Sequence, residues 1–298
     1  MAAIHPPRLK KQVSELVLAY AEPELFQRKL RDLFDFYGDL TRRTSKQSRK
    51  PTGLPSMNVP PPVIRQVVMQ LTPYAETAPQ AVLALARTLW AVPQLEHRQL
   101  AAQLVGKIPV DDAQQVLTLV TVWCMQNFEE SVLDSMAVHS LTRLQKENPA
   151  LLLDSIQDWM DPPKPEQSED EEDIAERQDR PPLLPGNQIA YLNLQKLALT
   201  ALPPLVQSPQ FENLPRIYSL LDRVLQDAPK TLRPYILDVL RPLAKRAPQE
   251  VAYILKQQLS EHPSAHIKWL ARRVYTSLPE EFHAGLYPLI FDKGQDDT

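Results

Sequence analysis

Residues 89–109 read LWAVPQLEHRQLAAQLVGKIP, and this stretch shows the unit from which the whole chain is built. Apolar residues lead up to Trp90, Pro93 follows, and a second apolar run begins after Glu96–Arg98. Proline has no backbone N–H to donate and therefore stops a helix, whereas an acidic residue suits the first turn of the next helix. The stretch therefore predicts one helix ending near Trp90 and a second helix that opens at Glu96–Arg98.

The composition of the chain favours many short helices. Thirty of the 298 residues are proline and only six are glycine, against usual shares of about 5% and 7%. Glycine-rich phosphate loops and Asn-Gly hairpin turns are therefore excluded as recurring features. The prolines fall between apolar segments, where they mark the starts and stops of helices. Examples are Pro60, Pro93, Pro109, Pro149, Pro229, Pro248, Pro263 and Pro279.

Apolar residues between the prolines recur every three or four positions, as in Val82, Leu83, Ala86 and Leu89. No segment alternates with period two for long enough to predict a strand. The predicted helices come in antiparallel pairs about 40 residues apart, which is the period of HEAT-type repeats. The predicted fold is all-α, a curved α-solenoid of HEAT-like helix pairs forming a single domain over residues 1–298. A globular helical bundle is the rival architecture.

One acidic segment interrupts this pattern. Residues 161–180 contain nine acidic and three basic residues, a net charge of −6. The whole chain carries −3, so the remaining residues carry +3. High charge with few apolar residues predicts a disordered insertion at about 161–183 in a loop between helices. An alternative interpretation is that the segment mimics nucleic acid and screens a basic concave face.

Basic residues gather in two other regions. TRRTSKQSRKP, residues 41–51, contains Arg42 and Arg43 and no acidic residue, and the C-terminal part contains Arg233, Arg241 and Lys245. Such residues bind nucleic acid when they converge on one surface, because each phosphate contact releases a condensed counterion. The alternative is that they are ordinary solvated residues on helix faces.

Other features exclude several classes of protein. No stretch reaches the roughly 18 apolar residues of a spanning helix, and MAAIHPPRLKKQVSEL lacks the apolar core of a signal peptide. Cys124 is the single cysteine, so an internal disulfide and a cysteine-based metal site are excluded. We expect a cytoplasmic protein that does not enter a membrane.

Motifs for metal, nucleotide and serine-nucleophile chemistry are also missing. The six histidines are scattered, and Pro263 separates the only pair with helical spacing, His262 and His266. There is no HExxH, P-loop, GxGxxG or GxSxG motif. We therefore expect no metal and no cofactor, so any catalysis must come from a few side chains on helices.

Four stretches, taken in order, resemble the AlkD-like DNA alkylation-repair glycosylases. They are GLPSMNVPPPVIRQVV (53–68), LWAVPQLEHRQLAAQLVGKIP (89–109), WCMQNFEESVLDSMAVHSL (123–141) and LRPYILDVLRPLAKRAPQEVAYIL (232–255). The resemblance implies a HEAT-like fold that holds double-stranded DNA in its concave groove. It also implies hydrolysis of the N-glycosidic bond of N3- or N7-alkylpurines, with a carboxylate stabilising the positive charge that develops on the sugar.

The resemblance carries over residue by residue with two departures. The family's catalytic aspartate falls on Asp134, its phosphate-binding arginine on Lys196, and a later arginine on Arg241. Its two lesion-contacting aromatic residues fall on Glu130 and Asp238, although a shift of two residues would bring Phe128 into the first position. Glu96 and Arg98 are interpreted as structural residues at a helix start.

Two interpretations follow from these residues. The first is a monomeric alkylation-repair-like protein, with Asp134 as the catalytic residue. Its DNA-binding residues are Lys196, Arg233, Arg241, Lys245, Arg42 and Arg43. The second is a non-catalytic HEAT-repeat scaffold that binds a protein or a nucleic acid. The missing aromatic residues are the reason that both are retained.

Overall fold

The computed structural model describes residues 4–42, 53–126, 129–161 and 185–291. Within these ranges the regular elements are α-helices and short 3₁₀ turns, and none is a strand, so the all-α prediction is confirmed. The acidic insertion lies almost wholly outside the described residues, and so does Arg43.

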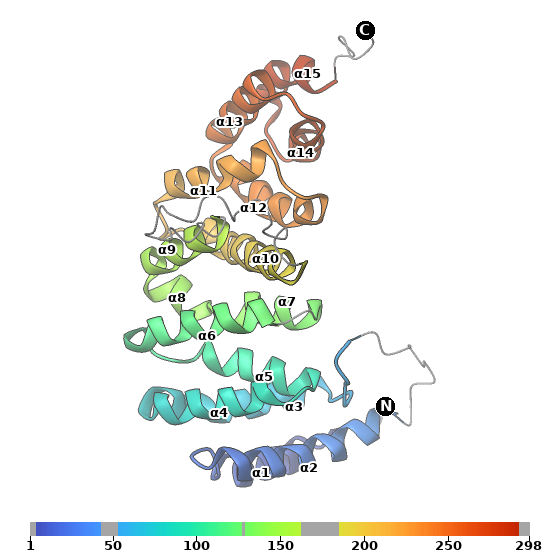
Figure 1. The fold of residues 1–298 in the computed structure, drawn as a ribbon, viewed down its shortest axis with the longest axis vertical. Helices are drawn as coiled ribbons and strands as arrows, with labels where there is room; N and C mark the ends of the chain where they lie inside the picture. The colour runs from blue at the N-terminus through green and yellow to red at the C-terminus, as the bar shows by residue number, and fades with distance from the viewer. Residues whose placement is uncertain (1–3, 43–52, 127–128, 162–184, 292–298) are drawn as a thin grey trace, which may run out of the picture. The chain divides into compact units, whose positions relative to one another are not determined.

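Most of the helices follow one another with short connections (Figure 1), whereas residues 43–60 separate α2 from α3 and residues 161–184 separate α9 from α10. Those of the first half are α1 (Pro6–Val17), α2 (Pro23–Arg42), α3 (Pro61–Thr77), α4 (Pro79–Ala91), α5 (Leu95–Val105), α6 (Ala113–Gln126), α7 (Glu130–His139) and α8 (Thr142–Glu147). Those of the second half are α9 (Pro149–Met160), α10 (Pro185–Gln207), α11 (Leu214–Gln226), α12 (Arg233–Arg246), α13 (Pro248–Glu261), α14 (Ala265–Tyr275) and α15 (His283–Phe291). The 3₁₀ turns are η1 (Val110–Asp112), η3 (Lys230–Leu232) and η4 (Glu280–Phe282).

Proline marks many of the helix boundaries, as the sequence predicts. Helices α3, α9 and α13 begin at Pro61, Pro149 and Pro248, where the missing N–H leaves no helical bond unmade. Other prolines lie inside helices, a use that the boundary pattern does not predict. Pro242 in α12 is one of them; it costs the helix one hydrogen bond and lies between the buried Leu240 and Leu243.

Contacts divide the chain into two compact units. The first comprises Met1–Leu152 and Pro185–Asn193, and the second comprises Leu153–Leu184 and Leu194–Thr298. In the first unit α1 packs on α2 and α3, α2 on α4, α3 on α4 and α5, and α5 on both α4 and α7. Helices α1 to α5 thus contact their successor or the next helix but one, as stacked helix pairs do.

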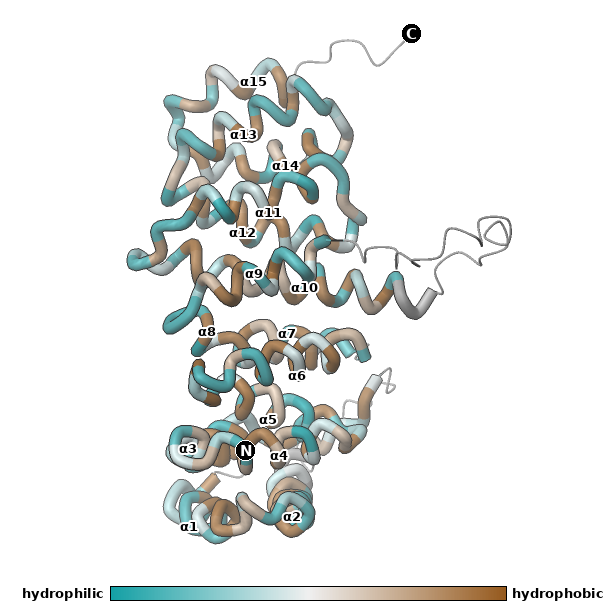
Figure 2. Tube along the Cα trace, turned by 60° about the vertical axis from the view of Figure 1, so that its left-hand side comes forward, coloured by the Kyte–Doolittle hydropathy of each residue, from teal (hydrophilic) through white to brown (hydrophobic). Residues whose placement is uncertain are grey.

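The second unit packs in a similar way, with one contact that spans three helices. There α12 packs on α13 and α14, α13 on α14 and α15, and α11 on α14. Apolar and polar residues alternate along the helices of both units (Figure 2), and the apolar ones form the cores. The curved solenoid and the single domain over residues 1–298 stay predictions.

Helices α5 and α7 approach each other closely at their C-terminal ends. A Cβ atom on Gly106 would lie 1.8 Å from the backbone oxygen of His139, so only glycine fits there. The Ser140 hydroxyl donates to the carbonyl of Ala102 at 2.9 Å, which ties the end of α7 to the middle of α5. The position of α7 is therefore set by backbone contact with α5.

None of the described helices combines the length and the apolar character that a bilayer crossing requires.

Candidate functional site

Glu96 is a structural carboxylate at the start of α5. It is 3% exposed and accepts hydrogen bonds from the Ser56 hydroxyl at 2.6 Å and from the Met57 backbone N–H at 3.0 Å. The Leu95 backbone N–H donates in turn to the Pro55 carbonyl at 3.0 Å. These bonds hold the segment 53–59 against the N-terminus of α5, which confirms the structural interpretation of Glu96.

The two residues after Glu96 also face the interior. His97 is 1% exposed, its ring meets Phe34 edge to face, and burial lowers its pKa to about 4. The guanidinium of Arg98 lies 5.2 Å from the ring of Trp90 in α4, and Trp90 stacks on Trp123 of α6 with the ring centroids 4.4 Å apart. Arg98 therefore contacts a neighbouring helix, as expected of a structural residue.

Asp134 lies on α7, and its side chain is exposed. The start of this helix is fixed by Glu129, whose carboxylate accepts from the Leu54 backbone N–H at 3.2 Å and from the Ser131 hydroxyl at 3.1 Å. Gly53 has a φ of +135°, and a Cβ there would lie 2.0 Å from the same carboxylate. The segment 53–59 thus anchors the first turns of both α5 and α7 within the first unit.

Acidic residues dominate the first turns of α7. Glu130 is exposed one turn before Asp134, on the same helix face because the two residues are four positions apart. Phe128, the residue that a two-residue shift would bring into the aromatic position, lies outside the described part of the chain. When the family's residues are carried over without a shift, Glu130 therefore stands at the position of the first aromatic residue.

In the second unit, an aromatic residue lies beside Lys196 of α10, the residue predicted to bind phosphate. The ammonium of Lys196 lies 5.9 Å from the ring centroid of Tyr235 on α12, within the range of a cation–π contact. Both side chains are half-buried. The resemblance places the family's aromatic residue at Asp238, three residues further along α12, and Tyr235 is a separate aromatic residue one helical turn before it.

Arg241 and Lys245 share one exposed face of α12, since they are four residues apart. Asp238 lies on the same face, and its carboxylate is 3.9 Å from the Arg241 guanidinium. The side chains are 64% and 47% exposed, so this ion pair contributes roughly 1 kcal/mol or less to stability. Its main effect is to offset part of the positive charge that this face presents.

Arg233, at the first position of α12, lies beside α14. Its guanidinium carbon is 5.3 Å from the ring centroid of Trp269, and that of Arg273 is 5.4 Å from the same ring. The Arg233 Nε–H also donates to the Nδ1 atom of His266 at 3.2 Å. One tryptophan of the second unit is thus contacted by two guanidinium groups from two helices.

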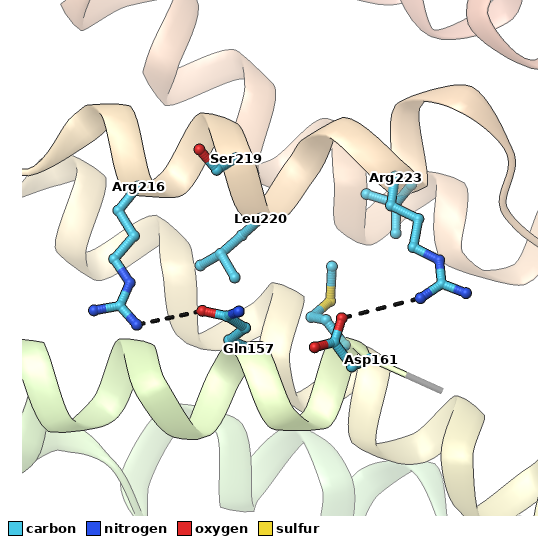
Figure 3. Close-up of a pocket in the computed structure, with 8 residues that line it drawn as sticks. Gln157, Asp161, Arg216, Ser219, Leu220 and Arg223 are labelled. Carbon is cyan, nitrogen blue, oxygen red and sulfur yellow. Dashed lines mark hydrogen bonds and ion pairs between the residues drawn. The ribbon is translucent and has the colours of Figure 1, made fainter. Parts of the chain in front are cut away.

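A small pocket lies between α9 and α11 in the second unit (Figure 3). Arg216 of α11 forms an ion pair with Asp154 and donates to Gln157 at 3.4 Å, while Arg223 lies 4.0 Å from Asp161. The cavity has a volume of about 130 Å³, below the roughly 300–1,000 Å³ of typical ligand sites. Its arginines therefore bind protein groups, and we assign no ligand to it.

The predicted site residues divide between the two units. Asp134 belongs to the first unit, whereas Lys196, Arg233, Arg241 and Lys245 belong to the second, on α10 and α12. Arg42 is the last residue of α2, and Arg43 lies outside the described residues. Lys196 contacts Tyr235 of α12, and Arg233 is the first residue of the same helix. A site that these residues share with Asp134 stays a prediction.

The sequence motifs did not point to Tyr235 or Trp269, and His266 stood out only as half of a histidine pair with helical spacing. A signal for two of them is present in HIKWLARR, residues 266–273, where Trp269 stands among three basic residues on one helix. Basic residues interleaved with aromatic residues are typical of nucleic-acid interfaces. Among the described residues, no group of three or more His, Cys, Asp and Glu could hold a metal ion.

Comparison with known proteins gives one match. Residues 30–164 match a family model described as DNA alkylation repair enzyme, which covers just under half of the chain. The matched range includes Glu96, Gly106 and Asp134, so the resemblance predicted from the sequence is confirmed there. No curated protein and no solved structure matches the chain.

Proposed function

From the match of residues 30–164 to DNA alkylation repair enzymes, we propose that the protein is a cytoplasmic monomer that binds double-stranded DNA and excises N3- or N7-alkylpurines from it. The family match supports an alkylation-repair-like role in general. The finer proposal of base excision rests on the resemblance of α7, whose exposed Asp134 lies within the matched range.

The proposed reaction needs little from the protein. An alkylated purine carries a positive charge, so the electron pair of the broken N-glycosidic bond passes to a base that leaves as a neutral molecule. The sugar carbon becomes positively charged, and the carboxylate of Asp134 stabilises it in the transition state. Water then adds its oxygen to that carbon and releases a proton to solvent. No general acid, metal or cofactor is required.

DNA binding is proposed to use the basic residues of the second unit, Lys196, Arg233, Arg241 and Lys245. Four phosphate contacts predict that the logarithm of the association constant falls with the logarithm of salt concentration with a slope of roughly −4. The ring of Tyr235 beside Lys196 supports this surface, because nucleic-acid interfaces combine cations with aromatic rings.

Fluorescence anisotropy with a labelled duplex tests the binding. We expect Lys196→Gln to weaken binding and to reduce the magnitude of the salt slope by about 1. Lys256 is an exposed lysine on α13, and Lys256→Gln is the matched control, which should leave the slope unchanged. A slope that is the same in all three proteins would refute the assignment of Lys196.

A second function stays open because one observation favours it. Glu130 and Asp238 occupy the positions of the family's aromatic residues, and both are exposed acidic side chains that repel DNA. A non-catalytic HEAT-repeat scaffold would retain the fold and lack base release. Salt-dependent binding without release would indicate a DNA-binding scaffold, whereas failure of the wild-type protein to bind DNA would indicate a protein-binding scaffold.

A further inference from the structure

On helix α14 of the second unit, the ring of Trp269 is contacted by two arginines, Arg233 and Arg273. The guanidinium carbons lie 5.3 Å and 5.4 Å from the indole centroid. Trp269 and Arg233 are half-buried, whereas Arg273 is exposed. Two positively charged groups therefore contact one indole at a surface, although like charges repel each other. Such a pair is stabilised when an anion binds between or beside the two groups.

His266 fixes the orientation of one of these arginines. The imidazole is buried, and its Nε2 atom lies 2.8 Å from the carbonyl oxygen of Val224 on α11. A carbonyl oxygen only accepts hydrogen bonds, so Nε2 carries the proton and Nδ1 keeps its lone pair. Nδ1 then accepts the Nε–H of Arg233 at 3.2 Å. The tautomer of His266 is thus determined by the backbone of α11.

This bond decides which part of the Arg233 guanidinium can meet a ligand. A guanidinium has five N–H donors, and the Nε–H of Arg233 is used by His266. The four N–H groups on the two Nη atoms lie outside that bond. Their fork geometry matches two oxygens of a phosphate, which is the ligand that arginine binds in bidentate fashion.

We propose that Arg233, Trp269 and Arg273 form a phosphodiester-binding subsite for the DNA backbone, and that His266 is its positioning residue. The proposal rests on the proposed DNA-binding function and adds a contact on α14. The tryptophan aligns the two guanidinium groups, and the imidazole fixes the donor edge of Arg233. Nothing in this subsite reads the base sequence, because its donors suit phosphate oxygens.

Four variants of the full-length protein test the subsite by anisotropy with an undamaged, labelled duplex at several salt concentrations. Arg233→Gln and Arg273→Gln should each weaken binding roughly tenfold at low salt and reduce the magnitude of the salt slope by about 1. Trp269→Leu should weaken binding but change the salt slope less than the two arginine variants do, since it removes no charge. Lys256→Gln on α13 is the control and should behave as wild type.

Two substitutions of His266 separate positioning from packing. An asparagine can place its oxygen near the Nδ1 position, so His266→Asn retains an acceptor for Arg233 but loses the bond to Val224. A glutamine can place its amide nitrogen near the Nε2 position, so His266→Gln retains the bond to Val224 but loses the acceptor. We expect His266→Asn to lower the melting temperature and keep the DNA affinity. We expect His266→Gln to keep the melting temperature and lower the DNA affinity.

The outcomes are distinguishable. If the wild-type protein does not bind DNA, the proposed function fails. If the wild type binds and Arg233→Gln and Arg273→Gln match Lys256→Gln, the subsite is wrong while the proposed function stands. If both His266 variants change affinity and melting temperature together, His266 only packs α14 against α11, and its positioning role is refuted.

Discussion

The free energy of unfolding of the wild-type protein should fall in acid because of His97, and replacing His97 with leucine should abolish this fall. The imidazole is 1% exposed, and burial is the main reason that its pKa falls from 6.5 to about 4. The charge of Arg31 lowers this pKa further, whereas the nearby carboxylates of Glu96 and Asp35 raise it. The folded protein therefore keeps His97 neutral at a pH where the unfolded chain is already protonated.

The sign and size of the effect follow from the two pKa values. Between pH 6.5 and pH 4 the unfolded state binds more protons than the folded state, so the free energy of unfolding falls as the pH falls. Each unit of pKa difference corresponds to about 1.4 kcal/mol. The difference between 6.5 and about 4 therefore predicts a loss of about 3 kcal/mol at pH 4, and none above pH 7.

Urea unfolding at pH 7, 6, 5 and 4, followed by circular dichroism, measures this loss. The stacked pair of Trp90 and Trp123 provides a signal that belongs to the first unit. Acidic groups add their own pH dependence, so the informative quantity is the difference between wild type and His97→Leu at each pH. That difference should shift by about 3 kcal/mol in favour of the variant between pH 7 and pH 4.

The exposed His262 is the control, and His262→Gln should follow the wild-type curve. A difference between wild type and His97→Leu that stays constant from pH 7 to pH 4 would refute the reasoning. It would mean that His97 is not held neutral by burial, and that the interior around α5 is open to water.

Three further changes test other parts of the structure. Glu96→Ala should lower the free energy of unfolding by about 3 kcal/mol in urea titrations, because the Met57 N–H loses its acceptor, and Glu96→Gln should lower it less. Gly106→Ala should lower the free energy of unfolding by more than about 1–3 kcal/mol and should lower the melting temperature, since the added Cβ would overlap the His139 carbonyl. Asp238→Asn should strengthen duplex binding severalfold at low salt, and less at high salt, because it removes a negative charge from the basic face of α12.

Each of these has an outcome that contradicts it. Equal stability of Glu96→Ala and wild type would mean that the segment 53–59 is not anchored by this carboxylate. A neutral Gly106→Ala would mean that α5 and α7 are further apart than the structure has them. Asp158→Asn removes an exposed charge from α9, and an equal gain in affinity there would mean that Asp238 acts only through net charge.

The all-α fold is predictable from the sequence because its signals are local. Period-3.6 apolar residues and prolines at boundaries define helices such as α4 and α5 without any tertiary information. Interior prolines such as Pro242 are not predictable in this way. A proline removes one helical hydrogen bond wherever it stands, so the local pattern alone does not tell an interior proline from one at a helix boundary.

The candidate site is predictable only in part. The structural role of Glu96 follows from its place at a helix start, but its partners, Ser56 and Met57, lie about 40 residues earlier in the chain. The contact between Lys196 and Tyr235 joins two helices, so no spacing within one motif reveals it. The mapping to the family compares sequence positions, so it yields Asp238 and gives no sign of the contact with Tyr235.

The most direct test of the central claim is base release under single-turnover conditions. The protein is held in excess over a duplex that carries one 7-methylguanine, and the free base is quantified by chromatography. We predict first-order release by the wild type and by Glu130→Gln, the matched carboxylate one turn before Asp134, and only spontaneous release by Asp134→Asn, which should still bind DNA. Release by Asp134→Asn at the wild-type rate would contradict the assignment of Asp134.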